Sequence, residues 1–247
     1  MSEKPDKAGR INRKALIAGL LILIAIPATI YAGVVFMDDR KYYFISMLIV
    51  IYSLIPFFMA FEGRKPQARE IIIVAVLTAI AVAGRAAFFM LPQFKPVTAI
   101  VIIAGVSIGA EAGFLVGSMT ALVSNFFFGM GPFTPWQMFC LGLIGFLAGL
   151  LAKKGYLKKT KTALCIFGGL SAFILFGLIM DFSSVIMLTQ EITKESAAAT
   201  FVAGLAFNLM HSAATVFFLL VFAKPMIDKV ERIKIKYGLM EQRDKQK

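Results

Sequence analysis

The sequence predicts an all-α integral membrane protein, and three observations support this class. Hydrophobic residues make up 59% of the 247-residue chain and charged residues only 16%, whereas a soluble domain carries about a quarter charged residues. The mean hydropathy is +0.82. Several apolar runs reach the length of about 20 residues that crosses a hydrocarbon core, and the sequence lacks the alternating pattern of a transmembrane barrel.

Eight apolar segments are predicted to span the membrane. The fourth is too short to cross alone, so we expect it to pair with the fifth through a shallow bend at Gly105, Gly109 and Gly113. The first follows a basic stretch like that of a signal peptide, but its length of about 22 residues exceeds a signal core, so we interpret it as an uncleaved anchor. The predicted spans are 15–36, 42–61, 70–91, 96–108, 111–128, 137–152, 162–188 and 200–222.

The distribution of basic residues predicts the orientation, because cytoplasmic loops are enriched in Lys and Arg. With the N-terminus inside, 21 basic residues fall on cytoplasmic segments and four on outer loops, at Arg40, Lys41, Lys95 and Lys194. We therefore expect a multi-pass protein of the cell membrane with both termini cytoplasmic. The net charge of +12 is then explained by attraction to anionic lipid and requires no nucleic acid.

Sequence motifs give no indication of an enzyme, a metal site or a bound cofactor. Cys140 and Cys165 both lie in apolar spans and are expected to be small buried hydrophobes. The chain has no nucleotide-binding, metal-binding or nucleophile motif of the familiar kinds. If it drives uphill transport with ATP, the ATPase must be another chain.

Polar residues inside the spans are candidate functional residues, because ionisable groups are costly in a bilayer. The predicted spans place all of them in the outer half of the bundle, where they would line a cavity open to the outside. Several alternatives stay open: Arg85 and Asp181 as a structural ion pair, His211 as a contact between helices, and Asn125 as a helix cap. The candidates are Arg85, Asn125, Gln137, Asp181, Asn208 and His211.

The segment Gly129-Met-Gly-Pro-Phe-Thr-Pro-Trp-Gln137 is predicted to be a rigid outer turn. Two prolines restrict its backbone, and it presents Phe133, Gln137 and the chain's one tryptophan, Trp136. Trp136 alone would fit an anchor in the membrane interface. The prolines favour instead a lid that covers the cavity.

Ala75, Ala79 and Ala83 recur every four residues on the third predicted span. Small residues at this spacing form a smooth stripe that lets another helix approach closely. The stripe would contact either a helix of the same chain or a separate subunit.

Residues from about 70 to 222 resemble the substrate-binding S components of energy-coupling factor (ECF) vitamin transporters. The resemblance rests on several stretches in order: the alanine stripe up to Arg85, Pro92-Gln-Phe-Lys-Pro96-Val-Thr-Ala, Gly113-Phe-Leu-Val-Gly117, Leu122-Val-Ser-Asn125, and the 129–137 segment. It implies a six-helix bundle that captures a vitamin on the outer face, with both termini cytoplasmic. It also implies that the alanine stripe docks on a membrane coupling subunit, which carries two ATPase subunits.

This resemblance divides the chain into four parts. They are a basic cytoplasmic N-terminus at 1–14, two additional transmembrane helices at 15–61, the S-component-like substrate-binding domain at 70–222, and a charged cytoplasmic tail at 223–247. The additional helices depart from the six-helix pattern and would cover one flank of the bundle.

The stretches at 96–99 and 129–137 look most like the S components assigned to cobalamin, although riboflavin and other vitamins stay open. Phe133 and Trp136 would cover the ligand, and the polar candidates would orient it. The alternative function is a self-contained secondary transporter or channel for a small organic solute. That alternative would require polar groups in both halves of the membrane or an inverted repeat, and neither is visible in the sequence.

Overall fold

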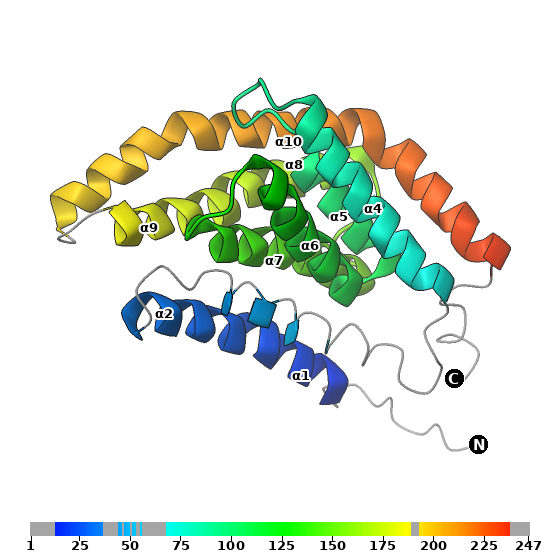
Figure 1. Cartoon of the computed structure of the whole chain (residues 1–247). Helices are drawn as coiled ribbons and strands as arrows, with labels where there is room; N and C mark the ends of the chain where they lie inside the picture. Colours follow the sequence, from blue (N-terminus) through cyan, green and yellow to red (C-terminus); the bar gives the residue numbers. More distant parts are fainter. Residues whose placement is uncertain are drawn as a thin grey trace, which may run out of the picture.

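The computed structural model describes residues 13–36, 44–45, 47–49, 51–52, 55, 68–188 and 193–237. Every regular element in these ranges is a helix, which confirms the all-α class (Figure 1). Four described helices are long and apolar enough to cross a membrane, and three shorter apolar helices accompany them. The predicted span 42–61, the N-terminus before Arg13 and the tail after Tyr237 lie wholly or largely outside the described residues.

The helices follow the predicted spans with shifted ends. The N-terminal rod consists of α1 (Arg13–Leu20), a π-helical stretch (Leu21–Ala25) and α2 (Ile26–Phe36). The bundle is formed by α4 (Ala68–Ala87), α5 (Val97–Ile108), α6 (Ala110–Phe128), α7 (Phe133–Lys153), α8 (Lys161–Leu170), a second π-helical stretch (Ser171–Phe176), α9 (Gly177–Leu188) and α10 (Lys194–Tyr237).

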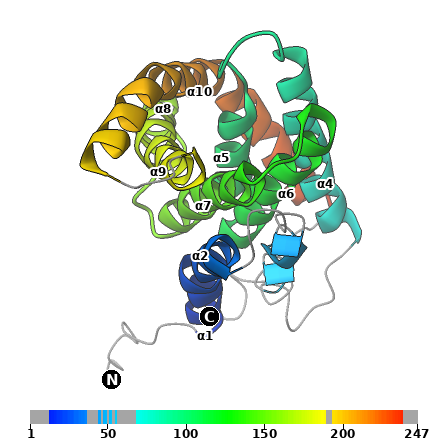
Figure 2. The same ribbon diagram turned by 60° about the vertical axis from the view of Figure 1, so that its left-hand side comes forward.

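The short helix α5 forms the centre of the bundle. It packs against α4, α6, α7, α8 and α10, which surround it in Figure 2. Nearly all of its residues are buried, and at 1.5 Å per residue it is only about 18 Å long. A helix that is apolar all round and covered on every side needs no contact with lipid, which explains how so short a segment fits in a membrane bundle.

The connection from α5 to α6 corrects the predicted shallow bend. A single residue, Gly109, joins the two helices with φ 139° and ψ 171°, a conformation that glycine adopts readily because it has no Cβ. The helices fold back on each other, and a Cβ added at Gly113 would lie 2.7 Å from Gly105 Cα. The glycines that suggested a bend are therefore the contact between two adjacent helices.

Glycines also bring α6 and α7 into backbone contact. A Cβ added at Gly145 would lie 2.3 Å from the carbonyl oxygen of Gly113, and one at Gly117 would lie 2.4 Å from that of Leu141. Ser118 Oγ donates to the carbonyl of Met138 across the same interface. Small residues let membrane helices pack closely in this way, so α5, α6 and α7 form the rigid part of the bundle.

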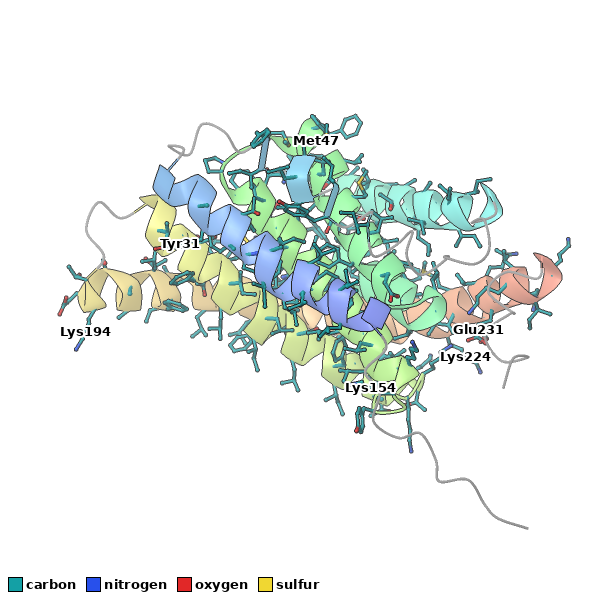
Figure 3. The ribbon with its side chains drawn as sticks, turned by 90° about the horizontal axis from the view of Figure 1, so that it is seen from below. Tyr31, Met47, Lys154, Lys194, Lys224 and Glu231 are labelled. Carbon is teal, nitrogen blue, oxygen red and sulfur yellow. The ribbon has the colours of Figure 1, made fainter. Side chains whose placement is uncertain are left out.

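The N-terminal rod lies against one side of this rigid part. Ala18, Ile22, Ile26 and Ile30 repeat every four residues and are almost fully buried, and α2 contacts α7. Figure 3 shows the rod crossing the bundle diagonally. The rod thus covers the α7 flank, while the second additional segment, 42–61, lies largely outside the described residues.

Helix α10 is longer than the predicted span 200–222 and absorbs the first part of the predicted tail. It runs as one 44-residue helix with Pro225 inside it and arches over the bundle (Figure 1). Lys194 marks one end, and Glu231 lies toward the other (Figure 3). Beyond the apolar part, Lys234 Nζ donates to the carbonyl of Ser107 near the end of α5, and Lys159 pairs with Glu231. These contacts join the extension to the end of α5 and to the segment before α8.

Candidate functional site

The first polar cluster lies where α4 ends, and we call it the Arg85 cluster: Arg85, Ser124, Asn125, Thr134 and Gln137. Arg85 Nη1 donates to Ser124 Oγ at 2.6 Å and to Asn125 Oδ1 at 2.7 Å. The guanidinium also lies 5.4 Å from the centre of the Phe128 ring, within the range of a cation–π contact. All three partners come from the last turns of α6, so Arg85 joins α4 to α6.

Asn125 is the centre of this cluster and is completely buried. Its Oδ1 accepts from Arg85, while its Nδ2 donates to Thr134 Oγ1 at 3.1 Å and to Gln137 Oε1 at 2.9 Å. Both amide hydrogens therefore have partners. The alternative that Asn125 only caps α6 is wrong, because its side chain connects α4 and α7 as well.

The predicted turn 129–137 is mostly helical, which corrects its extent. Only residues 129–132 connect the helices, since α7 begins at Phe133. Pro135 fits in this first turn because the first N–H groups of a helix have no intrahelical acceptor. Thr134 Oγ1 also accepts from the N–H of Gly131. Trp136 and Gln137 therefore lie in the first turns of α7 and not in a loop.

The two aromatic candidates of this segment have different surroundings. A Cβ added at Gly131 would lie 2.5 Å from the Phe133 ring, so Phe133 folds back over the connecting loop. The Trp136 ring instead meets the Phe182 ring edge to face at 6.3 Å. This contact joins the start of α7 to α9. Phe182 follows Asp181 in the sequence.

The second polar cluster is the pair Asp181 and Asn208, which joins α9 to α10. Asn208 Nδ2 donates to Asp181 Oδ2 at 2.7 Å. Glycines face both side chains, since a Cβ at Gly204 would clash with the Asp181 carboxylate and one at Gly177 with the Asn208 amide. The possible ion pair between Arg85 and Asp181 is not formed, because the two groups have separate partners.

The third polar contact joins α10 to the start of α5. His211 Nε2 lies 2.7 Å from Thr98 Oγ1 in a buried position, and the Phe176 ring meets the imidazole edge to face at 4.5 Å. The structure therefore places His211 against a neighbouring helix, one of the two roles that its sequence left open.

Sequence reasoning missed Ser124, Thr134 and Thr98 as members of these clusters. Small hydroxyl residues are common in membrane helices and often bond to their own backbone, so nothing in their spacing distinguishes them. All three do lie inside the stretches that carried the family resemblance, which was the one available signal.

The alanine stripe lies on an open face of α4. Ala75, Ala79 and Ala83 are all exposed, while Val74 and Leu77 on the opposite side are buried. The alternative that the stripe packs on a helix of the same chain is therefore wrong for the part of the chain that the structure describes.

Together, the long apolar helices and the polar clusters that connect them define a multi-pass membrane protein. The model of one family, described as the ECF-type riboflavin transporter, S component, matches residues 65–227, which is more than half of the chain. The chain belongs to this family. It is thus a substrate-binding subunit of an ECF transporter, which works with the transmembrane and ATPase subunits of the ECF module. Searches of curated proteins and of solved structures give no match.

Proposed function

We propose that this chain captures a vitamin from outside the cell and delivers it inward, using ATP hydrolysis by its partner subunits. The observation that carries the proposal is the Arg85 cluster, a buried polar network at one end of an apolar bundle. Pockets for small ligands are mostly apolar with a few fixed polar groups that orient the ligand. In this proposal the Arg85 end faces outward and both termini lie in the cytoplasm.

The ligand would bind between the Arg85 cluster and the Asp181–Asn208 pair. Trp136 precedes Gln137 in the chain and its ring contacts Phe182, the neighbour of Asp181. In this proposal it lies between the two clusters and offers an apolar surface for stacking. Arg85 and Gln137 present polar groups on one side, and Asp181 and Asn208 on the other. Phe133 and His211, which have partners inside the protein, would border the site and shape it.

Two vitamins are candidates, supported by different observations. The family description supports riboflavin, and a planar ring with polar edges suits an aromatic side chain flanked by amides. The likeness of the 96–99 and 129–137 stretches to cobalamin-type S components supports a corrinoid. Because the family model covers far more of the chain than those two stretches, we favour a flavin.

Native mass spectrometry of the purified protein, followed by titration with riboflavin and with cobalamin, tests the ligand. We expect a bound or titratable flavin. A protein that binds cobalamin and no flavin would reverse the preference, and one that binds neither would refute the proposal. Uptake by liposomes that contain this chain alone would favour the self-contained transporter.

The alanine stripe is proposed to dock on the transmembrane coupling subunit. Its three side chains are small, adjacent and uncovered by described residues, so a partner helix can approach the α4 backbone closely. The N-terminal rod packs on α7 and leaves the stripe open.

Replacing Ala79 by leucine is expected to prevent complex formation and leave ligand binding unchanged, because the larger side chain holds the partner helix away. Co-purification with the coupling subunit measures the first effect and ligand titration the second. Ala206→Leu, on an exposed part of α10, is the matched control and should assemble normally. Normal assembly of Ala79→Leu would show that docking occurs elsewhere.

A further inference from the structure

We propose that the end of the bundle opposite the Arg85 cluster binds the headgroups of anionic lipids. Two segments form this basic surface: the stretch 153–161, which connects α7 to α8, and the last part of α10, 224–237. The first carries five lysines and no carboxylate, and the second carries five basic residues against two carboxylates. This lipid partner is distinct from the ligand at the candidate site.

The two segments lie at the same end of the bundle. Helix α7 begins at the Arg85 cluster and has 21 residues, so its last residue, Lys153, lies about 30 Å away from that cluster. Figure 3 shows Lys154, Lys224 and Glu231 toward one end of the molecule and Lys194 at the other. In the proposed orientation, the basic surface faces the cytoplasmic leaflet.

Defined contacts hold the two segments together. Lys159 pairs with Glu231, and Lys234 Nζ donates to the carbonyl of Ser107 at 2.8 Å. Ile227, one turn before Glu231, is buried in the core of the bundle. The last part of α10 is therefore packed against the bundle end, and the basic surface has a fixed arrangement.

The packing of α8 on α10 brings two further lysines to the same level. A Cβ added at Gly169 would lie 3.0 Å from Val216 Cγ2. Counting eight residues from this contact along each of the two antiparallel helices reaches Lys161 and Lys224, which lie at one level because both helices rise equally per residue. The same count in the other direction reaches the contact of Asn208 with its facing glycine, which supports the register.

Four of these cations have no carboxylate partner among the described residues. Lys154, Lys158, Lys161 and Lys224 are all exposed, and the ion pair between the two segments uses Lys159 instead. Like charges gathered in this way repel one another, and a bound anion relieves the repulsion. Lys and Arg grouped directly beyond the membrane-spanning part of a helix attract anionic headgroups.

The neighbours of the basic surface favour a lipid over an acidic protein. Ile166 and Leu170 on α8 and Leu220 and Phe222 on α10 are large, apolar and exposed, and they lie next to the cations along the same helices. Tyr156, within the first segment, is 80% exposed, and tyrosine is enriched where a membrane meets water. A change from exposed apolar to basic side chains along both helices matches the change from acyl chains to headgroups. A soluble acidic partner would match the cations alone.

The test counts the phosphatidylglycerol and phosphatidylcholine molecules that stay bound when native mass spectrometry releases the full-length protein from nanodiscs with equal amounts of both. Each basic residue beside an anionic surface adds roughly a fivefold preference, so we expect phosphatidylglycerol to be retained at least about tenfold more. Lys161→Gln combined with Lys224→Gln should remove most of this preference, and the corresponding pair of arginine substitutions should keep it. Lys95→Gln combined with Lys194→Gln removes two cations from the opposite end and is the matched control, which should also keep it.

The outcomes distinguish lipid binding from a protein partner and from the proposed function. Equal retention of both lipids by the wild type, or an unchanged preference in the glutamine pair, would overturn the inference. A glutamine pair that keeps the lipid preference but no longer co-purifies with the coupling or ATPase subunits would assign the surface to a protein and also overturn it. Titration with riboflavin and cobalamin should give the same result for the glutamine pair as for the wild type. A wild type that binds neither vitamin would refute the proposed function and leave the lipid result standing.

Discussion

Replacing Asn125 by leucine is expected to destabilise the protein and abolish tight ligand binding. The substitution keeps a similar volume but removes the acceptor of Arg85 and the donors to Thr134 and Gln137. Gln137 Oε1 loses the donor that it has among the described residues, whereas Arg85 keeps Ser124 and Thr134 keeps Gly131. A buried polar group left without a partner costs about 1–3 kcal/mol. Ligand binding should fall further, because Arg85 and Gln137 lose the group that orients them.

Thermal unfolding in detergent measures the first effect and ligand titration the second. Thr120→Val is the matched control, since Thr120 is also buried on α6 but its hydroxyl bonds only to the carbonyl of Val116 in the same helix. That loss should cost little. If Asn125→Leu melts and binds as Thr120→Val does, the network does not organise the site.

Replacing Gly145 by valine is expected to prevent formation of the native bundle. Its Cβ would lie 2.3 Å from the carbonyl oxygen of Gly113 and close to the Val101 side chain, so α7 would have to move away from both α5 and α6. Overpacking of a core costs about 1–3 kcal/mol when side chains can adjust. Here the obstacle is backbone, which makes a larger loss the expected result.

The yield of monodisperse protein after extraction measures this effect. Gly19→Val is the matched control, because a Cβ at Gly19 meets nothing within 4 Å and the substitution lies in the N-terminal rod. Normal yield of Gly145→Val would mean that α6 and α7 do not pack as closely as described.

The polar candidates show how far sequence reasoning reached. The rise along a helix predicts the depth of each residue, so the sequence placed the polar groups at one end of the bundle. It did not predict their partners, because a residue's partner depends on which helices are neighbours. Asp181, for example, pairs with Asn208 on α10 and not with Arg85.

The sequence by itself determined the all-α membrane class, most of the helices and the family, because hydrophobic length and ordered motifs are local properties of the chain. Only the tertiary structure decided that α5 is a buried central helix, that Gly109 makes a sharp reversal and that α7 begins at Phe133. It also decided that no described residue covers the alanine stripe and that Asn125 connects three helices. These features depend on how helices pack around one another, and contacts between residues as far apart as Arg85 and Asn125 arise only when the bundle has formed.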